Sequence, residues 1–237
     1  MAHEVLRGDH HVHSTFSDDA VSTLAENVEA AAARGLTRLR LVDHVRRSTT
    51  WVPEYLAAVR ALDVPDGLTV LSGVEAKVLN AAGDLDIPAL PGGIDRILIA
   101  DHQFPGVDGP LGPTAVRERI AAGWAPDDVL DQFVSALISS MTRYPGNQLA
   151  HCFSILPKIG LAERQLGSER LQAWAEAAAS TNTLVEVNEK WGCPEPSTLR
   201  ALRTAGAELV ASTDSHVATD VGRYDRVKTL LDDAGLL

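Results

Sequence analysis

The amino-acid sequence predicts an α/β barrel, and three observations support this fold class. Seven strand-like stretches alternate with stretches of helical character, which is the pattern of a parallel sheet covered by helices. A chain of 237 residues is long enough for one such barrel, and barrel closure fits this length better than an open sheet does. We find no internal repeat, low-complexity run or linker, so we expect a single domain that spans residues 1–237.

Each element is placed by its composition and by the residues at its ends. We expect strands at residues 4–13, 37–43, 68–79, 94–101, 148–152, 183–189 and 208–213. Ser22 or Thr23 can cap the first helix, Gly35 can end it in a left-handed conformation, and Pro53 opens the next helix. We expect helices at about residues 24–34, 53–62, 127–144, 168–180, 197–204 and 223–234.

Two segments break the alternation of strands and helices. Residues 80–93 contain several glycines and prolines, so we expect a hairpin-like excursion there. Residues 103–110 form a Pro/Gly-rich loop that could shape or cover a site.

Composition and charge limit the possible functions. The net charge of −11 argues against a protein that binds nucleic acid through electrostatics alone, since phosphate binding needs an excess of Lys and Arg. The two cysteines are too few for a disulfide framework or a thiolate zinc site. The chain opens with no signal segment, and no apolar run approaches the roughly 20 residues that span a bilayer. We therefore expect a cytoplasmic protein that does not bind membranes.

The first strand carries the densest group of metal-ligating residue types. In the stretch Asp9-His10-His11-Val12-His13, alternate side chains share a face, so His11 and His13 should point the same way. Two imidazoles at this spacing can bind one metal ion, and Asp9 is expected on the same face. The pair needs further ligands from later strands.

Later strands supply ligand-type residues at or just beyond their carboxyl ends. These residues are His44, Glu75, His102, His151, Asp214 and His216, with Glu186 and Asn188 in the sixth strand. In a barrel the carboxyl ends of the strands form one face, which is where active sites are built. Six of the eight histidines lie at these ends, so the set as a whole predicts a site there.

The ordered series His11-x-His13, Asp43-His44, Gly73-x-Glu75, His102, His151 and Asp214-x-His216 resembles the PHP (polymerase and histidinol phosphatase) superfamily of metal-dependent phosphoesterases. The resemblance covers residues 7–220. Residues 73–80 and 83–86 are similar in particular to single-domain phosphatases of the YcdX type and to the PHP domains of bacterial family X DNA polymerases. The resemblance implies a distorted (β/α)7 TIM-like barrel with a trinuclear metal centre.

The resemblance also implies a ligand set. His11, His13, Glu75 and Asp214 would bind one metal ion, and Glu75 would bridge to a second ion completed by His102 and His151. A third ion would be held by His44, His216 and an acidic residue six positions after the second histidine, which is Asp19; Asp18 is the adjacent alternative. Asp9, Asp43 and Asp101 are candidates to orient neighbouring imidazoles.

Nitrogen and oxygen ligands without thiolate suit zinc, manganese or iron, so we expect three divalent ions of one or more of these metals. Clustered dications would make hydroxide available near neutral pH for in-line attack on phosphorus. We expect Glu75, Asp214, His216 and His44 to take part in the catalysis.

The predicted substrate is a small phosphorylated metabolite. Candidates to bind its phosphate or another anionic group are Arg46, Lys77, Lys190 and Arg223.

Three alternatives to a phosphomonoesterase remain open. The first is a phosphodiesterase or exonuclease of the same family, although the acidic balance weighs against polymeric DNA. The second is an amidohydrolase-type barrel that cleaves C–N bonds, which usually has a lone Asp after its last strand and a bridging Lys rather than Asp214-x-His216 and Glu75. The third is a metal-binding protein without catalysis. The sequence does not indicate whether the protein is a monomer or an oligomer.

Overall fold

The computed structural model describes residues 2–237, and within them seven parallel strands form one sheet in the order β1-β2-β3-β4-β7-β8-β9. The strands are β1 (Gly8–Val12), β2 (Arg38–His44), β3 (Thr69–Lys77), β4 (Arg96–Ala100), β7 (Gln148–Leu149), β8 (Leu184–Asn188) and β9 (Leu209–Ser212). Each predicted strand has its counterpart in the sheet. The α/β fold class and the count of seven barrel strands are therefore confirmed.

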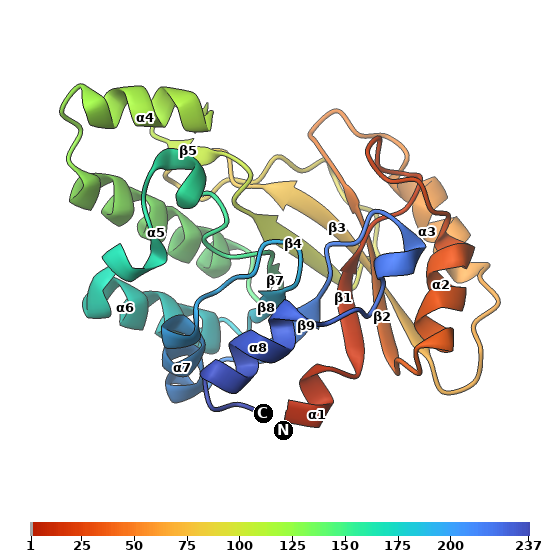
Figure 1. Cartoon of the computed structure of the whole chain (residues 1–237). Helices are drawn as coiled ribbons and strands as arrows, with labels where there is room; N and C mark the ends of the chain where they lie inside the picture. Colours follow the sequence, from red (N-terminus) through yellow and green to blue (C-terminus); the bar gives the residue numbers. More distant parts are fainter. Residues whose placement is uncertain (1) are drawn as a thin grey trace.

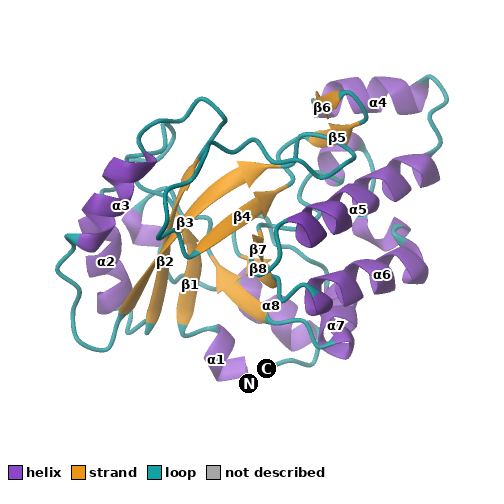
Figure 2. Cartoon of the chain, turned by 180° about the vertical axis from the view of Figure 1, so that it is seen from behind, coloured by secondary structure: helices purple, strands orange, loops and turns teal. Residues whose placement is uncertain are grey.

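The sheet curls until its first and last strands meet. A parallel bridge joins Val12 to Ser215, which follows β9, and the His13 N–H donates to the Ser215 carbonyl at 2.8 Å. Figure 2 shows the strands side by side around a common axis. The result is a nearly closed barrel whose strands all run the same way, so their carboxyl ends lie together.

The α-helices pack on the outside of the barrel. They are α1 (Ala2–Val5), α2 (Leu24–Ala33), α3 (Val52–Arg60), α4 (Pro113–Ala121), α5 (Pro126–Arg143), α6 (Gly167–Ser180), α7 (Pro196–Ala205) and α8 (Arg226–Asp233). Three short 3-10 helices are η1 (Pro157–Ile159), η2 (Glu163–Gln165) and η3 (Ala218–Asp220). Figure 1 shows α2 and α3 on one side of the strands and α5, α6 and α7 on the other.

The ends of α2 illustrate how local sequence sets a helix. Thr23 caps the helix, and its side chain forms a reciprocal capping box with Glu26. Gly35 follows the helix with a φ of 69°, the left-handed conformation that glycine adopts without strain. The predicted boundaries of this helix, including its cap and its terminating glycine, are confirmed to within a residue.

Three local features differ from the sequence prediction. The first strand begins at Gly8 rather than residue 4, because Ala2–Val5 form α1 and a hydrogen bond from Arg7 N–H to the Glu4 carbonyl closes a turn after it. The loop predicted at 103–110 contains an antiparallel hairpin of β5 (Phe104–Gly106) and β6 (Gly109–Leu111). Helix α4 was not predicted, although Pro113 at its first position is a typical start signal.

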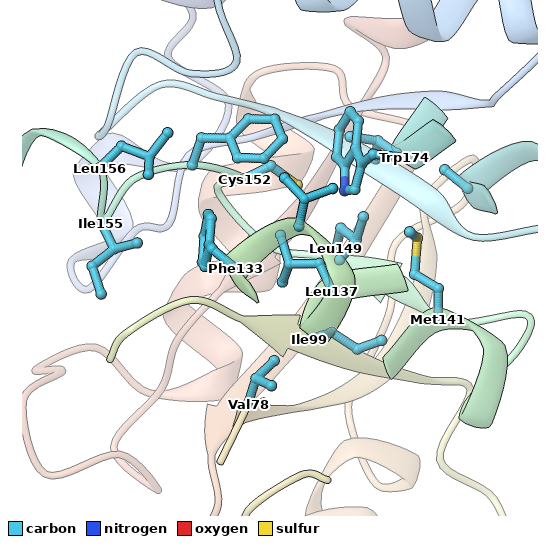
Figure 3. Close-up of a cluster of buried hydrophobic side chains, with 14 of the residues drawn as sticks. Val78, Ile99, Phe133, Leu137, Met141, Leu149, Cys152, Ile155, Leu156 and Trp174 are labelled. Carbon is cyan, nitrogen blue, oxygen red and sulfur yellow. The ribbon is translucent and has the colours of Figure 1, made fainter. Parts of the chain in front are cut away.

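The largest apolar core lies between the barrel wall and α5 and α6. Figure 3 shows part of it, where Phe133, Leu137 and Met141 of α5 meet Leu149 of β7. Cys152 belongs to the same buried cluster, so its thiol packs against the wall and has no part in the polar end of the barrel. Within residues 2–237, every helix is too short or too polar to cross a lipid bilayer.

Candidate metal centre

A cluster of histidines and carboxylates lies at the carboxyl ends of the barrel strands. His11 lies in β1, His44 ends β2 and Glu75 lies in β3. The remaining members follow the ends of their strands: His13, His102, His151, Asp214 and His216. The structure therefore brings together side chains from six of the seven strands, over a sequence span of more than two hundred residues.

Glu75 stands at the centre of this cluster. Its Oε1 atom lies 3.0 Å from the Nε2 atom of His102 and 3.0 Å from the Nε2 atom of His151. The side chain of Glu75 is fully buried, so neither oxygen faces bulk water. This oxygen and the two imidazoles make up one half of the centre.

The second oxygen of Glu75 faces a different set of imidazoles. The Oε2 atom lies 2.8 Å from His44 Nδ1, 3.3 Å from His11 Nε2 and 3.5 Å from His13 Nε2. One carboxylate therefore separates two groups of nitrogen donors. This is the arrangement expected of a bridging ligand, because a carboxylate can offer one oxygen to each of two ions.

Two aspartates complete the cluster on the solvent side. Asp214 Oδ1 lies 3.2 Å from His13 Nε2 and 3.9 Å from His11 Nε2. Asp19 Oδ2 lies 3.5 Å from His44 Nε2 and 3.3 Å from His216 Nε2. Of the two adjacent acidic residues considered from the sequence, the structure thus places Asp19 against the histidines, while Asp18 lines the neighbouring cavity.

A β-bulge in the first strand aims the leading histidines. The register pairs Asp9 with Leu39 and Val12 with Leu41, so β1 has one more residue than β2 in this interval. The bulge breaks the simple alternation along the strand. His11 and His13 still converge, with their Nε2 atoms 3.0 Å apart, but Asp9 turns away and accepts hydrogen bonds from Thr213 and Gly222. The expected placement of Asp9 beside the two imidazoles was wrong for this reason.

Buried acids outside the cluster orient two of the imidazoles. Glu186 Oε1 lies 2.9 Å from His11 Nδ1, and Asp101 Oδ1 lies 3.2 Å from His151 Nδ1. In both rings Nδ1 is engaged and Nε2 is left to face Glu75. The sequence suggested this role for Asp101, but it did not identify the role of Glu186.

Asp43 acts less directly. Its Oδ1 atom accepts a 2.6 Å hydrogen bond from the Ser17 hydroxyl, and the Ser17 Oγ atom lies 3.4 Å from His13 Nδ1. Asp43 therefore reaches the nearest imidazole only through a serine.

The charge states of the cluster follow from its mutual contacts. Burial alone would raise the pKa of Glu75, but the neighbouring His102 and His11 hold it well below its usual range. Burial would lower the pKa of His151, but its hydrogen bonds to Asp101 and Glu75 raise it to about 10. For His13 burial outweighs the contact with Asp214 and lowers the pKa to about 3. The acids are thus ionised and ready to bind cations.

The donor set fits divalent metal ions. Three groups of donors each have ligand atoms within 4.8 Å of one another: His13, His44 and His216; His11, His13 and Asp214; His44, Glu75 and His102. Imidazole nitrogens and carboxylate oxygens are ligands that zinc, manganese and iron accept. The second nitrogen of His11 and of His151 is already hydrogen-bonded, which is typical of metal-binding histidines.

Backbone strain accompanies the cluster. His151 has a φ of 28° and Asp214 a φ of 53°, both in a region that residues other than glycine rarely adopt. Such conformations cost about 1–3 kcal/mol each and persist where the surrounding structure holds them. They lie at the two turns that deliver ligand-type side chains from β7 and β9.

A cavity of about 350 Å³ opens beside the cluster. Of the four cationic residues predicted to bind substrate, three line it: Arg46, Lys77 and Lys190. Arg46 is exposed, whereas the Lys77 ammonium is 3.4 Å from Asp86. Arg223 lines a separate cavity next to it, and its guanidinium is 3.8 Å from Asp220. Trp191 also lines the first cavity, and sequence reasoning missed it because nothing near it in the chain indicates where its ring points.

The fold and the cluster together define a class of protein: an α/β barrel with a candidate polynuclear metal centre at the carboxyl ends of its strands. Residues 9–190 match the model of the PHP domain family. The chain therefore belongs to the PHP domain family, as its ligand series suggested.

Named relatives agree with this assignment. A probable phosphatase of Clostridium acetobutylicum is 26% identical over 240 residues, which cover 96% of this chain and 86% of the relative. A probable phosphatase of Enterobacter sp. is 26% identical over 242 residues, which cover 96% of this chain and 85% of the relative.

Solved structures share the fold. The histidinol phosphate phosphatase of Lactococcus lactis, solved with zinc, L-histidinol and phosphate, superposes with a TM-score of 0.64 at 17% identity and covers 97% of this chain and 94% of its own. The putative histidinol phosphatase of Listeria monocytogenes gives a TM-score of 0.64 at 15% identity, with 91% and 97% covered.

Proposed function

We propose that this protein is a metal-dependent phosphoesterase that hydrolyses a small phosphorylated substrate. The observation that carries the proposal is the position of Glu75, whose two oxygens divide five imidazoles into two groups within 3.5 Å. Membership of the PHP domain family and the relatives named as probable phosphatases support the same reaction class.

We infer three ion positions from the side chains. The first would use His11, His13, Glu75 and Asp214; the second Glu75, His102 and His151; the third His44, His216 and Asp19. Bound dications would lower the pKa of water and neutralise the charge of a phosphoryl group. Zinc fits this donor set, as do manganese and iron.

The protein's own residues have separate tasks in this scheme. Glu75 and Asp214 supply ionised oxygens, while Glu186 and Asp101 fix the tautomers of His11 and His151. Arg46 and Lys190 line the cavity from which a phosphate would approach, and their charges would hold it there. The buried position of Glu75 keeps bulk water from competing for its oxygens.

The test combines metal content with activity. Protein purified without chelator is subjected to elemental analysis, and phosphate release is measured with a panel of phosphomonoesters and a bis-aryl phosphodiester. We expect about three divalent ions per chain and metal-dependent hydrolysis; Glu75→Ala should bind fewer ions and lose the hydrolysis. Glu54→Ala, an exposed glutamate on α3, is the matched control and should keep both properties.

The outcomes separate the competing functions. Hydrolysis of monoesters alone would identify a phosphatase, and preference for the diester would favour a phosphodiesterase. Metal content without hydrolysis of either would favour a metal-binding protein or an amidohydrolase. Full activity in Glu75→Ala would contradict the proposed centre.

A further inference from the structure

Trp191 lies in a short turn whose backbone is held by several hydrogen bonds. The turn follows β8, and its ends are joined because the Asn188 N–H donates to the Cys193 carbonyl at 2.8 Å. The Trp191 N–H donates to the Asn188 side-chain oxygen at 3.1 Å, and Gly192 takes a left-handed φ of 62°. The Asn188 amide is held in turn by Glu186. The position of Trp191 is thus set by the same buried network that orients His11.

The indole of Trp191 contacts the ligand cluster through its N–H and a lysine through its face. Its Nε1–H donates a 2.8 Å hydrogen bond to Asp214 Oδ2. On its face, the Lys158 ammonium lies 3.8 Å from the ring centroid, within the range of a cation–π contact. The residue is 37% exposed and lines the cavity beside the cluster.

The two oxygens of Asp214 therefore have different surroundings. Oδ1 faces His13 Nε2 at 3.2 Å, whereas Oδ2 receives the indole N–H and lies 3.4 Å from the Lys190 ammonium. A carboxylate that is free to rotate could offer either oxygen, or both, to an ion. The indole N–H holds Oδ2, and Oδ1 is the oxygen that faces the imidazoles of His11, His13 and His216.

We propose that Trp191 is a positioning residue that holds Asp214 so that it acts as a one-oxygen ligand. This inference rests on the proposed function, since it concerns the ion bound by His11, His13 and Asp214. Partners that hydrogen-bond a metal-ligating side chain typically change metal affinity about 10–100-fold when they are removed. Trp191 is such a partner, because its indole N–H donates to Asp214 Oδ2 at 2.8 Å.

Lys190 is the less effective partner of the same oxygen. Its side chain is 43% exposed, and an ammonium on a flexible stem has three rotatable donors and no fixed direction. The indole has one donor in the plane of a rigid ring. The orientation of Asp214 therefore depends mainly on Trp191.

The test separates the hydrogen bond of the indole from its ring. Trp191→Phe removes the N–H and keeps an aromatic ring, whereas Trp191→Leu removes both. Trp124→Phe is the matched control, because Trp124 packs on Phe104 with centroids 5.3 Å apart and lies outside the cavity. Zinc affinity is measured by competition with a chromophoric chelator, together with circular dichroism and the kcat and KM of phosphate release.

We expect Trp191→Phe and Trp191→Leu to weaken one class of zinc site by about 10–100-fold, with unchanged circular dichroism and with Trp124→Phe indistinguishable from wild type. At saturating zinc, kcat should fall in Trp191→Phe while KM changes little.

Wild-type zinc affinity in Trp191→Phe would overturn the positioning role, even if the protein is a phosphatase. A rise of KM alone in Trp191→Leu would also overturn it, because the ring would then act on the substrate only. If the wild-type protein binds no zinc, manganese or iron, the proposed function fails and the inference fails with it.

Discussion

His10 and His11 are neighbours in the chain, are both buried, and have opposite chemical environments. His11 Nδ1 meets Glu186 at 2.9 Å and its Nε2 meets Glu75 at 3.3 Å. His10 Nδ1 has no hydrogen-bond partner among the described residues. Burial, reinforced by the charge of Arg40, lowers the pKa of His10 to about 3, whereas Glu186 and Glu75 outweigh burial and raise that of His11 well above its usual value.

The difference teaches that a buried imidazole becomes a candidate ligand only where carboxylates surround it. The barrel concentrates acids at the carboxyl ends of its strands, and it places arginine charges from Arg38, Arg40 and Arg96 around His10. Arg40 itself is 3% exposed, and its Nε atom has no hydrogen-bond partner in residues 2–237. A cation would be repelled from His10 and attracted to His11.

The largest effect is expected when His11, the histidine surrounded by carboxylates, is replaced. His11→Asn removes a donor that contacts Glu75 and leaves Glu186 with a weaker partner. The affinity for the ion held by His11 and the rate of phosphate release should therefore fall by at least about 100-fold, beyond the loss typical of an indirect partner, and metal content should fall by about one ion per chain. His10→Asn is the control in the adjacent position and should keep its metal. Elemental analysis and an assay of phosphate release compare the two; equal losses would mean that the two environments are not functionally distinct.

A smaller effect is expected when the histidine remains and only its acidic partner changes. Glu186 accepts hydrogen bonds from His11, from the His151 N–H at 3.1 Å and from Ser212 at 2.8 Å. Glu186→Gln puts an amide NH₂ among these donors, so metal affinity should fall by about 10–100-fold. Chelator competition measures this loss.

Glu189→Gln is the control for Glu186→Gln. Glu189 accepts backbone N–H groups at the start of α8, including those of Arg226 and Val227. Its replacement should leave metal affinity unchanged, and an equal loss in both variants would contradict the orienting role of Glu186.

At the other end of the barrel the expected change is in stability. Arg40→Met removes a buried guanidinium that, within residues 2–237, forms no ion pair, donates from Nη1 to the Ser72 carbonyl at 3.2 Å and leaves its Nε without a partner. The free energy of unfolding should therefore rise by about 1–3 kcal/mol. Urea unfolding measures the change, and Arg38→Met, at an exposed position on the same strand, should show little effect. A clear loss of stability in Arg40→Met would contradict this expectation and show that the contacts of the Arg40 guanidinium stabilise the folded protein.

A last effect, seen only as the pH changes, concerns an acid without an imidazole beside it. Burial raises the pKa of Glu163 from 4.5 to about 7, with smaller contributions from the charges of Glu195 and Asp101. The folded state therefore holds a proton that the unfolded state releases above pH 4.5, and the free energy of unfolding should fall by about 1–3 kcal/mol as the pH rises from 4.5 through 7. Glu163→Gln should flatten this part of the profile, measured by urea unfolding at several pH values; an unchanged slope would assign it to another group.

The sequence predicted the elements that depend on local signals. Thr23, Gly35 and the helix-opening prolines mark helix ends through their own side chains and backbone preferences, without contacts from distant segments. Because parallel strands bring their carboxyl ends together, eight ligand-type residues could be assigned to one face before any contact was known, and the family resemblance added Asp19. The structure does place them within contact distance; their role as ligands, like the single-domain organisation, stays a prediction.

The parts that sequence reasoning missed depend on contacts between distant segments. The bulge at His10 and His11 arises from the register of β1 against β2, and neither residue type signals it. Glu186 contacts His11 although the two residues are 175 positions apart in the chain, and Trp191 contacts Asp214 across 23 positions. The β5–β6 hairpin was also missed, because its two turn residues, Val107 and Asp108, do not form one of the typical hairpin turn pairs.

The seam between β1 and the segment after β9 also sets the order of assembly. Asp9 Oδ2 accepts a 2.6 Å hydrogen bond from the Thr213 hydroxyl, 204 positions later in the chain. Contacts of this separation form late in folding, because a long loop must close first. A chain leaving the ribosome cannot assemble His11 with Asp214 until the segment after β9 has emerged. We therefore expect the ion position formed by His11, His13 and Asp214 to become available only when the barrel closes.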